Sequence, residues 1–181
     1  LANIDPVLQL RVLKQIESPK LVASDTMNFW INSKFDDLKK VLAKVDVLLI
    51  NEGEADLISK KTNAIAAARE ILALGPKAVV IKRGEYGFVL YTKEGYFILP
   101  AYPVAEVMDP TGAGDTFAGA FFGYLAKQDK GFDLTVIKQA CVQGVLLASF
   151  TVQSFGVERL KTLTWTEVEN RGREYLKVTT L

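Results

Sequence analysis

The stretch MDPTGAGDTFAGAF, residues 108–121, carries the strongest functional signal in the chain. Two of the three residues in Gly112–Gly114 lack a Cβ, so their backbone N–H groups can approach a ligand closely. An alanine- and phenylalanine-rich run with helical character follows. A helix that starts near Gly114 presents free N–H groups and the positive end of its dipole. The stretch therefore predicts an anion-binding turn, with the carboxylate of Asp115 in the first helical turn.

A carboxylate beside an anion site can deprotonate a hydroxyl while the amides hold a phosphoryl group. The alternative is a structural helix start with an acidic first turn, which many helices have. Two other nucleotide motifs are excluded. Phe117 stands where G-x-G-x-x-G would have its third glycine, and no G-x-x-x-x-G-K-[ST] loop is present. On these residues alone, both interpretations of the turn stay open.

The composition narrows the chemistry that the chain can perform. Its 181 residues carry a net charge of +1, which gives no electrostatic argument for a nucleic-acid partner. There is no histidine and one cysteine, Cys141, so a zinc site and every Ser-His or Cys-His nucleophile are disfavoured. No charge-free apolar stretch of about 18 residues and no signal-peptide pattern is present, which predicts a cytoplasmic protein without membrane contact.

Hydrophobic patterns predict an α/β protein. The predicted helices cover 6–17, 35–44, 52–59, 63–74, 114–127, 134–152 and 165–177, and the predicted strands cover 20–25, 45–51, 78–82, 87–92 and 95–100. Strands alternate with helices at first, and a β-hairpin and further helices follow. This order predicts a three-layer α/β/α sandwich with a mainly parallel central sheet and the hairpin at one side. We expect a single domain over residues 1–181.

The stretch DPTGAGDTFAGAF, residues 109–121, resembles the carboxyl-terminal signature of the PfkB-type, or ribokinase-like, carbohydrate kinases, D-[TP]-[TN]-G-A-G-D-x-[FA]. Every constrained position matches. Four other segments resemble elements of that family in the same order: ASDTMNFW (23–30), NEGE (51–54), KRGEYG (82–87) and TVQSFGVE (151–158). The resemblance implies a ribokinase-like fold and transfer of the γ-phosphate of ATP to a hydroxyl of a sugar or nucleoside.

The resemblance also implies roles for single residues of the turn. Asp115 would be the catalytic base that takes the proton from the attacking hydroxyl. Gly112, Ala113 and Gly114 would form the anion hole for the transferred phosphoryl group, which suits a reaction that needs mainly positioning and electrostatics. The structural alternative for Asp115 is an acid at a helix start.

By the same resemblance, Asn51 and Glu54 would organise Mg²⁺ and phosphate through water. Their alternative is a helix start with Asn51 as N-cap and Glu54 at N3, and both roles can coexist. Asp109 and Thr111 would help to bind a monovalent cation such as K⁺, or would only form the turn around Pro110. Glu54, Asp109 and Thr111 are therefore the candidate metal ligands.

Two further elements would border the nucleotide. Lys82, Gly84 and Gly87 belong to the [TK]-x-G-x-x-G turn, although Lys82 could equally be a solvated lysine at a strand end. Ser154 and Gly156 belong to the loop that covers the adenine in the family. Together with Asn51 and Glu54, these residues form the predicted nucleotide site.

Family members are longer, and the chain resembles only their carboxyl-terminal part. The half that carries a Gly-Gly signature, the lid strands and most sugar contacts has no counterpart here, so Asp25 and Asn28 are weak candidates for sugar contacts. We expect a fragment of a longer kinase that is inactive alone, with an unpaired sheet edge that favours a homo-oligomer. The alternative is a nucleotide-binding or assembly module without turnover. The identity of the sugar or nucleoside is not determined.

Overall fold

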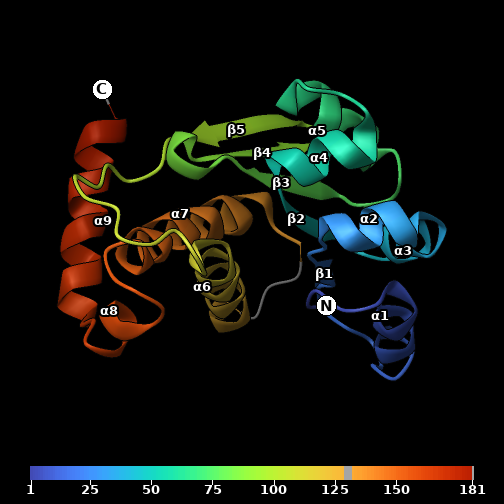
Figure 1. The fold of residues 1–181 in the computed structure, drawn as a ribbon, viewed down its shortest axis with the longest axis horizontal. Coiled ribbons are helices and arrows are strands. Elements are labelled where there is room, and N and C mark those ends of the chain that lie inside the picture. The colour runs from blue at the N-terminus through green and yellow to red at the C-terminus, as the bar shows by residue number, and fades with distance from the viewer. Residues whose placement is uncertain (129–131, 181) are drawn as a thin grey trace. The chain divides into compact units, whose positions relative to one another are not determined.

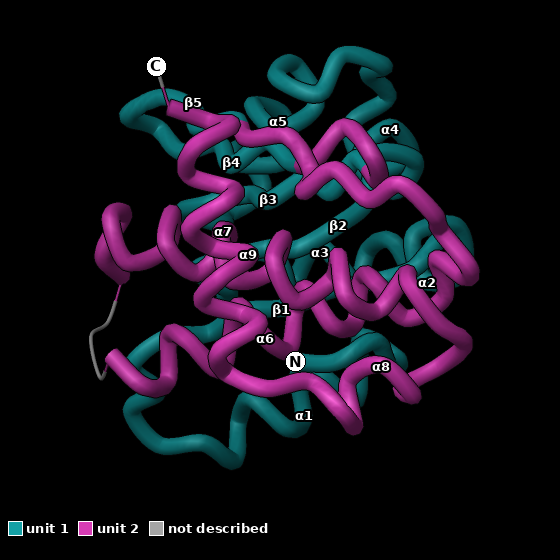
Figure 2. The backbone as a smooth tube through the Cα atoms, turned by 90° about the vertical axis from the view of Figure 1, so that its left-hand side faces the viewer, with its two compact units in different colours: residues 1–83, 88–98 teal, residues 84–87, 99–181 magenta. Residues whose placement is uncertain are grey.

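The computed structural model describes residues 1–128 and 132–180, and the backbone separates into two compact units (Figure 1, Figure 2). Unit 1 consists of Leu1–Arg83 and Phe88–Ile98, and unit 2 consists of Gly84–Gly87 and Leu99–Leu181. That the two units form a single domain stays a prediction.

Unit 1 is built on a five-stranded sheet with the order β1-β2-β3-β4-β5. The strands are β1 (Ala23–Ser24), β2 (Val47–Asn51), β3 (Ala78–Lys82), β4 (Phe88–Thr92) and β5 (Gly95–Leu99). β2 pairs in parallel with β1 and with β3, and β3 pairs antiparallel with β4. The predicted parallel strands and the hairpin at one side of the sheet are both present.

The sequence explains which strands lie at the centre of the sheet. The first four residues of β2 and of β3 are all buried, as expected for continuous apolar runs in strands covered on both faces. The hairpin strand β5 has exposed positions instead, and β1 has only two residues at the edge of the sheet. Short edge strands limit pairing with other chains.

Five helices belong to unit 1: α1 (Pro6–Leu13), α2 (Asn28–Ser33), α3 (Phe35–Leu42), α4 (Glu52–Ser59) and α5 (Ala64–Leu72). Side chains from α2 to α5 join Leu48, Ile50, Val79 and Ile81 of the sheet in one hydrophobic cluster. These four residues alternate along β2 and β3, so the cluster covers one face of the sheet (Figure 1).

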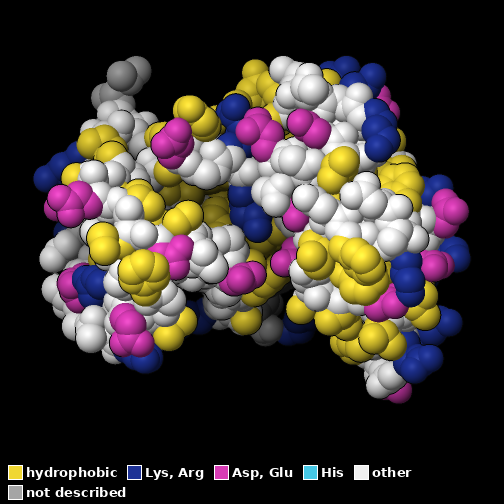
Figure 3. All heavy atoms as spheres, in the orientation of Figure 1, with side chains coloured by type: hydrophobic (Ala, Val, Ile, Leu, Met, Phe, Trp, Pro, Cys, Tyr) yellow, Lys and Arg dark blue, Asp and Glu magenta, His cyan; other side chains and the backbone are white. Residues whose placement is uncertain are grey.

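Exposed apolar side chains gather on another part of unit 1. Figure 3 shows hydrophobic side chains over the region of α1 and α2. The large exposed residues of these helices and of the residue before α2 are Val7, Leu8, Val12, Met27 and Phe29. Contiguous apolar surface of this kind is typical of an interaction site.

Unit 2 contains the short 3-10 helix η1 (Gly84–Tyr86) and the helices α6 (Ala113–Gln128), α7 (Leu134–Thr151), α8 (Glu158–Lys161) and α9 (Trp165–Thr179). α6, α8 and α9 all pack against α7 (Figure 1). Phe117 and Phe121 of α6 and Phe150 of α7 are buried in this core. The Cys141 thiol is fully buried, and this burial raises its pKa.

Among the described helices, α7 is long and apolar enough to cross a membrane by length and composition. More than half of it is buried inside the protein, where it packs against three other helices. A core helix meets the same criteria, so this feature is weak evidence for membrane contact.

Several predicted boundaries differ from the structure. The helix predicted over 6–17 ends at Leu13, and the strand predicted over 20–25 shortens to β1. Neither α2 nor α8 was predicted, because both are short and no side chain accepts a hydrogen bond at their N-caps, Met27 and Val157. A helix without a capping residue lacks the usual sequence signal for its start.

The contact between α6 and α7 gives a test of the packing in unit 2. A Cβ on Gly144 of α7 would lie 2.7 Å from a ring carbon of Phe117. Gly144→Ala should therefore lower the free energy of unfolding, because overpacking costs about 1–3 kcal/mol and the helix preference for alanine offsets only part of this. Gly123→Ala in α6 is the matched control, because a Cβ there meets nothing within 4 Å. It should stabilise by about 0.5–1 kcal/mol. Urea unfolding measures both, and equal effects would contradict the packing argument.

Candidate functional site

The predicted anion turn lies at the start of α6, which begins at Ala113. Gly112 precedes the helix with a φ of +82°, a conformation that other residues rarely adopt. The Ala113 amide donates to the carbonyl of Pro110, and the Thr116 amide donates to the carbonyl of Gly112. A Cβ on Gly112 would meet only the Thr151 methyl group, at 4.0 Å, so the space beside this glycine is open.

The side chain of Asp115 is exposed in the first turn of α6. The first amides of an α-helix have no intrahelical acceptors, and Asp115 lies among them. The turn thus combines backbone donors with a carboxylate on one helical turn. This geometry fits an anion site with a neighbouring catalytic base. It also fits the structural alternative, a helix start with an acidic first turn.

The turn is shaped by Asp109. Its Oδ1 accepts a hydrogen bond of 2.9 Å from the amide of Thr111, and this bond holds the pKa of the Asp109 carboxyl below its usual range. An aspartate that bonds the backbone two residues on is a common turn-forming arrangement. Asp109 therefore has the structural role in the turn, and a cation role for Asp109 and Thr111 stays a prediction.

Backbone hydrogen bonds connect this turn to the end of α7. The amides of Met108 and Asp109 both donate to the carbonyl of Val152, at 2.8 and 3.3 Å. The Thr151 hydroxyl donates to the Thr116 hydroxyl at 2.9 Å. Unit 2 therefore brings the predicted anion turn next to the beginning of the predicted adenine loop, although about 40 residues separate them in the chain.

We define the base loop as residues 152–157, between α7 and α8. Ser154 is occupied in shaping it, because its Oγ accepts a hydrogen bond of 2.9 Å from the amide of Arg159. Gly156 has a φ of +56° and no atom within 4 Å of the position of a Cβ. The apolar side chains of Phe155 and Val157 are exposed. A loop with an accessible backbone and exposed apolar side chains can contact the face of a nucleotide base such as adenine.

Unit 1 brings three other predicted residues together. Asn51 is the last residue of β2 and lies opposite Lys82, the last residue of β3. The Asn51 Oδ1 accepts a 2.9 Å bond from the Glu54 amide, and Glu54 Oε2 accepts a 2.9 Å bond from the Asn51 amide. This reciprocal pair is the capping box considered as the structural alternative. The capping role is confirmed, and it leaves room for a ligand role as well.

Glu54 has an unfavourable environment for a charged carboxylate. The residue is 8% exposed, and burial raises the pKa of its carboxyl, although the hydrogen bond from Asn51 and the charge of Lys82 act in the opposite direction. A nearby cation would favour the charged form of such a group. A cation site at this end of the sheet stays a prediction.

The two glycines of the KRGEYG turn have different roles. Gly84 has a φ of +57° and open space where a Cβ would be. A Cβ on Gly87 would lie 2.1 Å from the carbonyl oxygen of Leu99, so only glycine fits at this position, whose φ is +86°. Gly87 thus serves the backbone, whereas Gly84 leaves space that a ligand can enter.

The structure therefore assembles two groups of predicted residues, one in each unit. Asn51, Glu54 and Lys82 lie together in unit 1, and the turn at 109–116 lies beside the base loop in unit 2. That the two groups meet in one site stays a prediction. Within residues 1–128 and 132–180, no three side chains of His, Cys, Asp or Glu form a metal-binding group.

Comparison with solved structures gives the class of fold. Ribokinase from Thermotoga maritima superposes with a TM-score of 0.75 at 26% identity, over 95% of this chain and 55% of that chain. A putative ribokinase II from E. coli, in complex with ATP and Mg²⁺, superposes with a TM-score of 0.68 at 29% identity, over 85% of this chain and 49% of that chain. The predicted ribokinase-like α/β fold is confirmed.

The family follows from the sequence comparisons. Residues 8–163 match the pfkB family of carbohydrate kinases, and the chain belongs to this family. A cytidine kinase of Thermococcus kodakarensis is 34% identical over 136 residues, which are 72% of this chain and 47% of that enzyme. The chain spans about half the length of the curated relatives that it matches.

Several charged residues of unit 2 and one ion pair of unit 1 were not among the residues predicted from the sequence. Arg159, Glu167 and Arg171 form a network with neighbouring polar groups, and Arg83 pairs with Glu52 at 2.9 Å. A local signal existed only for Glu167, which stands three residues after the N-cap Thr164 of α9 in a capping box. The other contacts join distant segments and have no local pattern.

We expect Glu54 and Glu167 to make the free energy of unfolding depend on pH in opposite directions. Burial raises the pKa of Glu54 above the unfolded value of about 4.3, so the stability present below this pH is lost as the pH rises through the folded pKa. Hydrogen bonds from Thr164, and then Arg159, lower the pKa of Glu167 to about 2, so its contribution is present above the unfolded pKa and is lost as the pH falls toward 2.

Urea unfolding of Glu54→Gln and Glu167→Gln between pH 3 and pH 8 measures these dependences. Relative to the wild type, Glu54→Gln should become more favourable as the pH rises, because the glutamine keeps an acceptor oxygen but carries no charge. Glu167→Gln should be least costly at the lowest pH and most costly near neutral pH. Two curves with the same slope would contradict the assigned environments.

Proposed function

We propose that the protein binds ATP with Mg²⁺ and takes part in transfer of the γ-phosphate to a hydroxyl of a sugar or nucleoside. The observation that carries this proposal is the start of α6, where an open glycine of positive φ, first-turn amides and Asp115 lie within one turn. Membership of the pfkB family supports it, as do relatives named cytidine kinase and ribokinase.

In the proposed mechanism Asp115 accepts the proton of the attacking hydroxyl, and its exposed position suits this contact. The turn Gly112, Ala113 and Gly114 would stabilise the negative charge on the transferred phosphoryl group through the amides of its two glycines, while the Ala113 amide donates to the Pro110 carbonyl. Phosphoryl transfer requires little covalent chemistry from the protein, so orientation and charge stabilisation supply most of the catalysis. With no histidine in the chain, a carboxylate is the natural base near neutral pH.

The remaining predicted residues would bind the nucleotide. Glu54, together with Asn51, would hold water ligands of Mg²⁺, and bound Mg²⁺ would neutralise phosphate charge. Lys82 and the backbone at Gly84 would border the phosphates, while Gly87 shapes the turn. The backbone at Gly156 and the loop that Ser154 closes would contact the base. Asp109 and Thr111 are the residues we propose near a monovalent cation such as K⁺.

The proposal requires the two units to act as one nucleotide-binding domain, with Glu54 and Asp115 on the same ligand. We also propose a cytoplasmic location and a homo-oligomeric state. The exposed apolar side chains over α1 and α2 support self-association (Figure 3). Which sugar or nucleoside is used depends on contacts outside the residues assigned here.

A second function is that of a nucleotide-binding or assembly module. In this case the chain would bind nucleotide or assemble with a partner without turnover of its own. Transfer assays on the chain and on the complete reading frame that contains it separate the two functions. Turnover by neither would favour the binding module.

Asp115→Asn tests the proposed base. Calorimetric affinity for Mg·ATP should change by less than about twofold, whereas turnover on a panel of sugars and nucleosides should fall by roughly 10²–10⁴, the usual contribution of a positioned base. Turnover is measured in the complete reading frame. Asp36→Asn on α3, an exposed aspartate paired with Lys39, is the control and should change neither quantity. Unchanged turnover in Asp115→Asn would remove this residue from the mechanism.

Gly114→Val tests the anion hole. Valine at this position should weaken binding of Mg·ATP and of inorganic tripolyphosphate, because its side chain would occupy space needed by the anion. Gly119→Val is the matched control on the same helix, where a Cβ meets nothing within 4 Å. Both changes carry a similar helix-propensity effect, so circular dichroism should show similar helicity. If Gly114→Val binds the phosphates normally, or loses binding together with helicity, the anion-hole assignment is wrong.

A further inference from the structure

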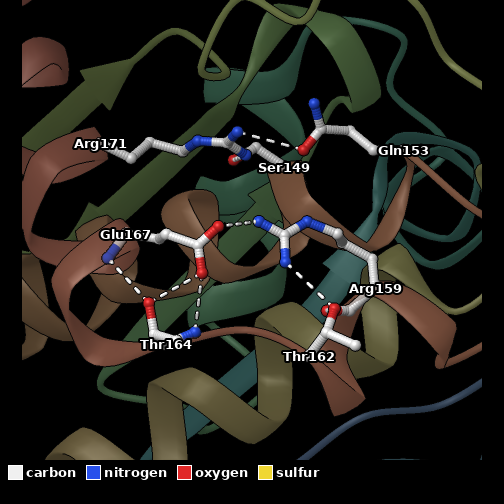
Figure 4. A network of polar contacts seen from close by, with 7 residues as sticks. All are labelled: Ser149, Gln153, Arg159, Thr162, Thr164, Glu167 and Arg171. Atoms are coloured by element: carbon white, nitrogen blue, oxygen red, sulfur yellow. Dashed lines mark hydrogen bonds and ion pairs between the residues drawn. The ribbon is translucent and has the colours of Figure 1, made fainter.

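The guanidinium of Arg171 on α9 contacts the carboxyl-terminal end of α7 (Figure 4). Nη1 donates to the Ser149 hydroxyl at 2.9 Å, and Nη2 donates to Oε1 of Gln153 at 3.1 Å. The same guanidinium lies 3.4 Å from the ring centroid of Phe150 and 4.7 Å from that of Tyr102. Arg171 therefore binds the last turn of α7 and the first part of the base loop at once.

A second connection runs from α9 to the other end of the base loop. Glu167 Oε1 accepts a 2.5 Å bond from Nη2 of Arg159, while its Oε2 accepts hydrogen bonds from the amide and hydroxyl of Thr164 (Figure 4). The backbone amide of Arg159 donates to Ser154 Oγ. The base loop is thus held by α9 on both sides, through Gln153 at its start and through Arg159 just after its end.

The chemistry of Arg171 requires an arginine. The guanidinium is partly buried, and desolvation lowers its pKa. Its two N–H groups donate to two separate acceptors, and its central carbon lies 3.4 Å from the ring centroid of Phe150, which is 2% exposed. A lysine offers neither the fork nor the planar stacking surface. A contact of this kind fixes geometry more strictly than a single exposed ion pair does.

α9 lies just after the segment that the family model matches, and the superposition on Thermotoga maritima ribokinase covers 95% of the chain. The match ends at residue 163, and α9 begins at Trp165. The carbonyl of Val152, inside the segment that Arg171 and Glu167 hold, also accepts the amides of Met108 and Asp109 from the anion turn. The helix α9 is therefore connected to the loop and, through Val152, to the neighbouring turn.

We propose that α9 positions the base loop for the nucleotide, with Arg171 and Glu167 as the positioning residues. This inference rests on the proposed function, because it assigns the base loop to the base of ATP. Arg171 touches neither the phosphates nor the acceptor hydroxyl in this scheme. It acts by holding Gln153, and thereby the backbone of residues 152–157, in the shape that contacts the base.

Contacts to the adenine base and contacts to the phosphates can be measured separately, because tripolyphosphate has no base. In the chain 1–181, Arg171→Met should weaken calorimetric affinity for Mg·ATP about tenfold, as expected for loss of hydrogen bonds from a charged donor. Affinity for inorganic tripolyphosphate with Mg²⁺, which has no base, should change less than about twofold. Arg171→Lys should not restore ATP affinity. Gln153→Leu should reproduce the loss, and the double variant should be no weaker than either single variant.

Arg173→Met is the matched control. Arg173 is an exposed arginine on the same helix that bonds Asn170, and its replacement should leave both affinities unchanged. Hydrogen exchange without nucleotide adds a measurement that does not depend on function. Amides of residues 152–159 should exchange faster in Arg171→Met than in the wild type, while the amides of β3 should not. If Arg171→Met fails to fold, Arg171→Lys and Gln153→Leu decide the matter.

The outcomes separate this inference from the proposed function. A wild-type chain that binds neither Mg·ATP nor tripolyphosphate would overturn the proposed function, and the inference with it. Wild-type binding of ATP with unchanged affinity or exchange in the Arg171 variants would overturn the inference alone. Equal weakening of ATP and tripolyphosphate would also overturn it, because Arg171 would then support the fold of unit 2 in general.

Discussion

The backbone carbonyl of Val152 connects the two segments that form the candidate site in unit 2. It accepts the amides of Met108 and Asp109, which fixes the residues before α6 to the end of α7. One carbonyl thus accepts hydrogen bonds from two consecutive backbone amides. A side-chain hydrogen bond, from the Thr151 hydroxyl to the Thr116 hydroxyl, also connects the end of α7 to the first part of α6. The predicted anion turn and the loop at 152–157 are therefore connected through the same carbonyl.

The helices that carry these segments are closely packed. Gly144 lets α7 approach Phe117 of α6 so closely that a single added methyl group would overlap with the ring. α9 packs on the same helix α7 and adds the arginine contact at its end. Because protein interiors have few voids, a shift of one packed helix requires its neighbours to move as well. The first turn of α6, with Asp115, is held in place by this core.

Unit 1 combines a structural and a proposed functional role in the same side chains. Asn51 and Glu54 complete the start of α4 by their reciprocal hydrogen bonds. The same Glu54 carboxyl is buried at the carboxyl ends of β2 and β3, where open sheets of this class bind their ligands. Burial raises the pKa of this carboxyl, and strongly perturbed carboxyl groups are found both in structural networks and in functional sites.

The sequence alone determined the elements whose signals are local. α4 and β3 have the predicted bounds, because a capping residue starts one and a continuous apolar run defines the other. The start of α6 was predicted near Gly114 and lies at Ala113, whereas its anion-binding role stays a prediction. The short helices α2 and α8 were not predicted, because they have no capping side chain and are too short to show a helical periodicity.

Only the tertiary structure decided which distant segments support the candidate site. No pattern in the sequence places Arg171 beside Phe150 and Gln153, or the carbonyl of Val152 beside Met108. These contacts arise from the way α6, α8 and α9 pack against α7, and side-chain packing depends on shape in three dimensions. Local propensity and periodicity describe a helix and the face that it buries. They carry no information on which partner that face meets.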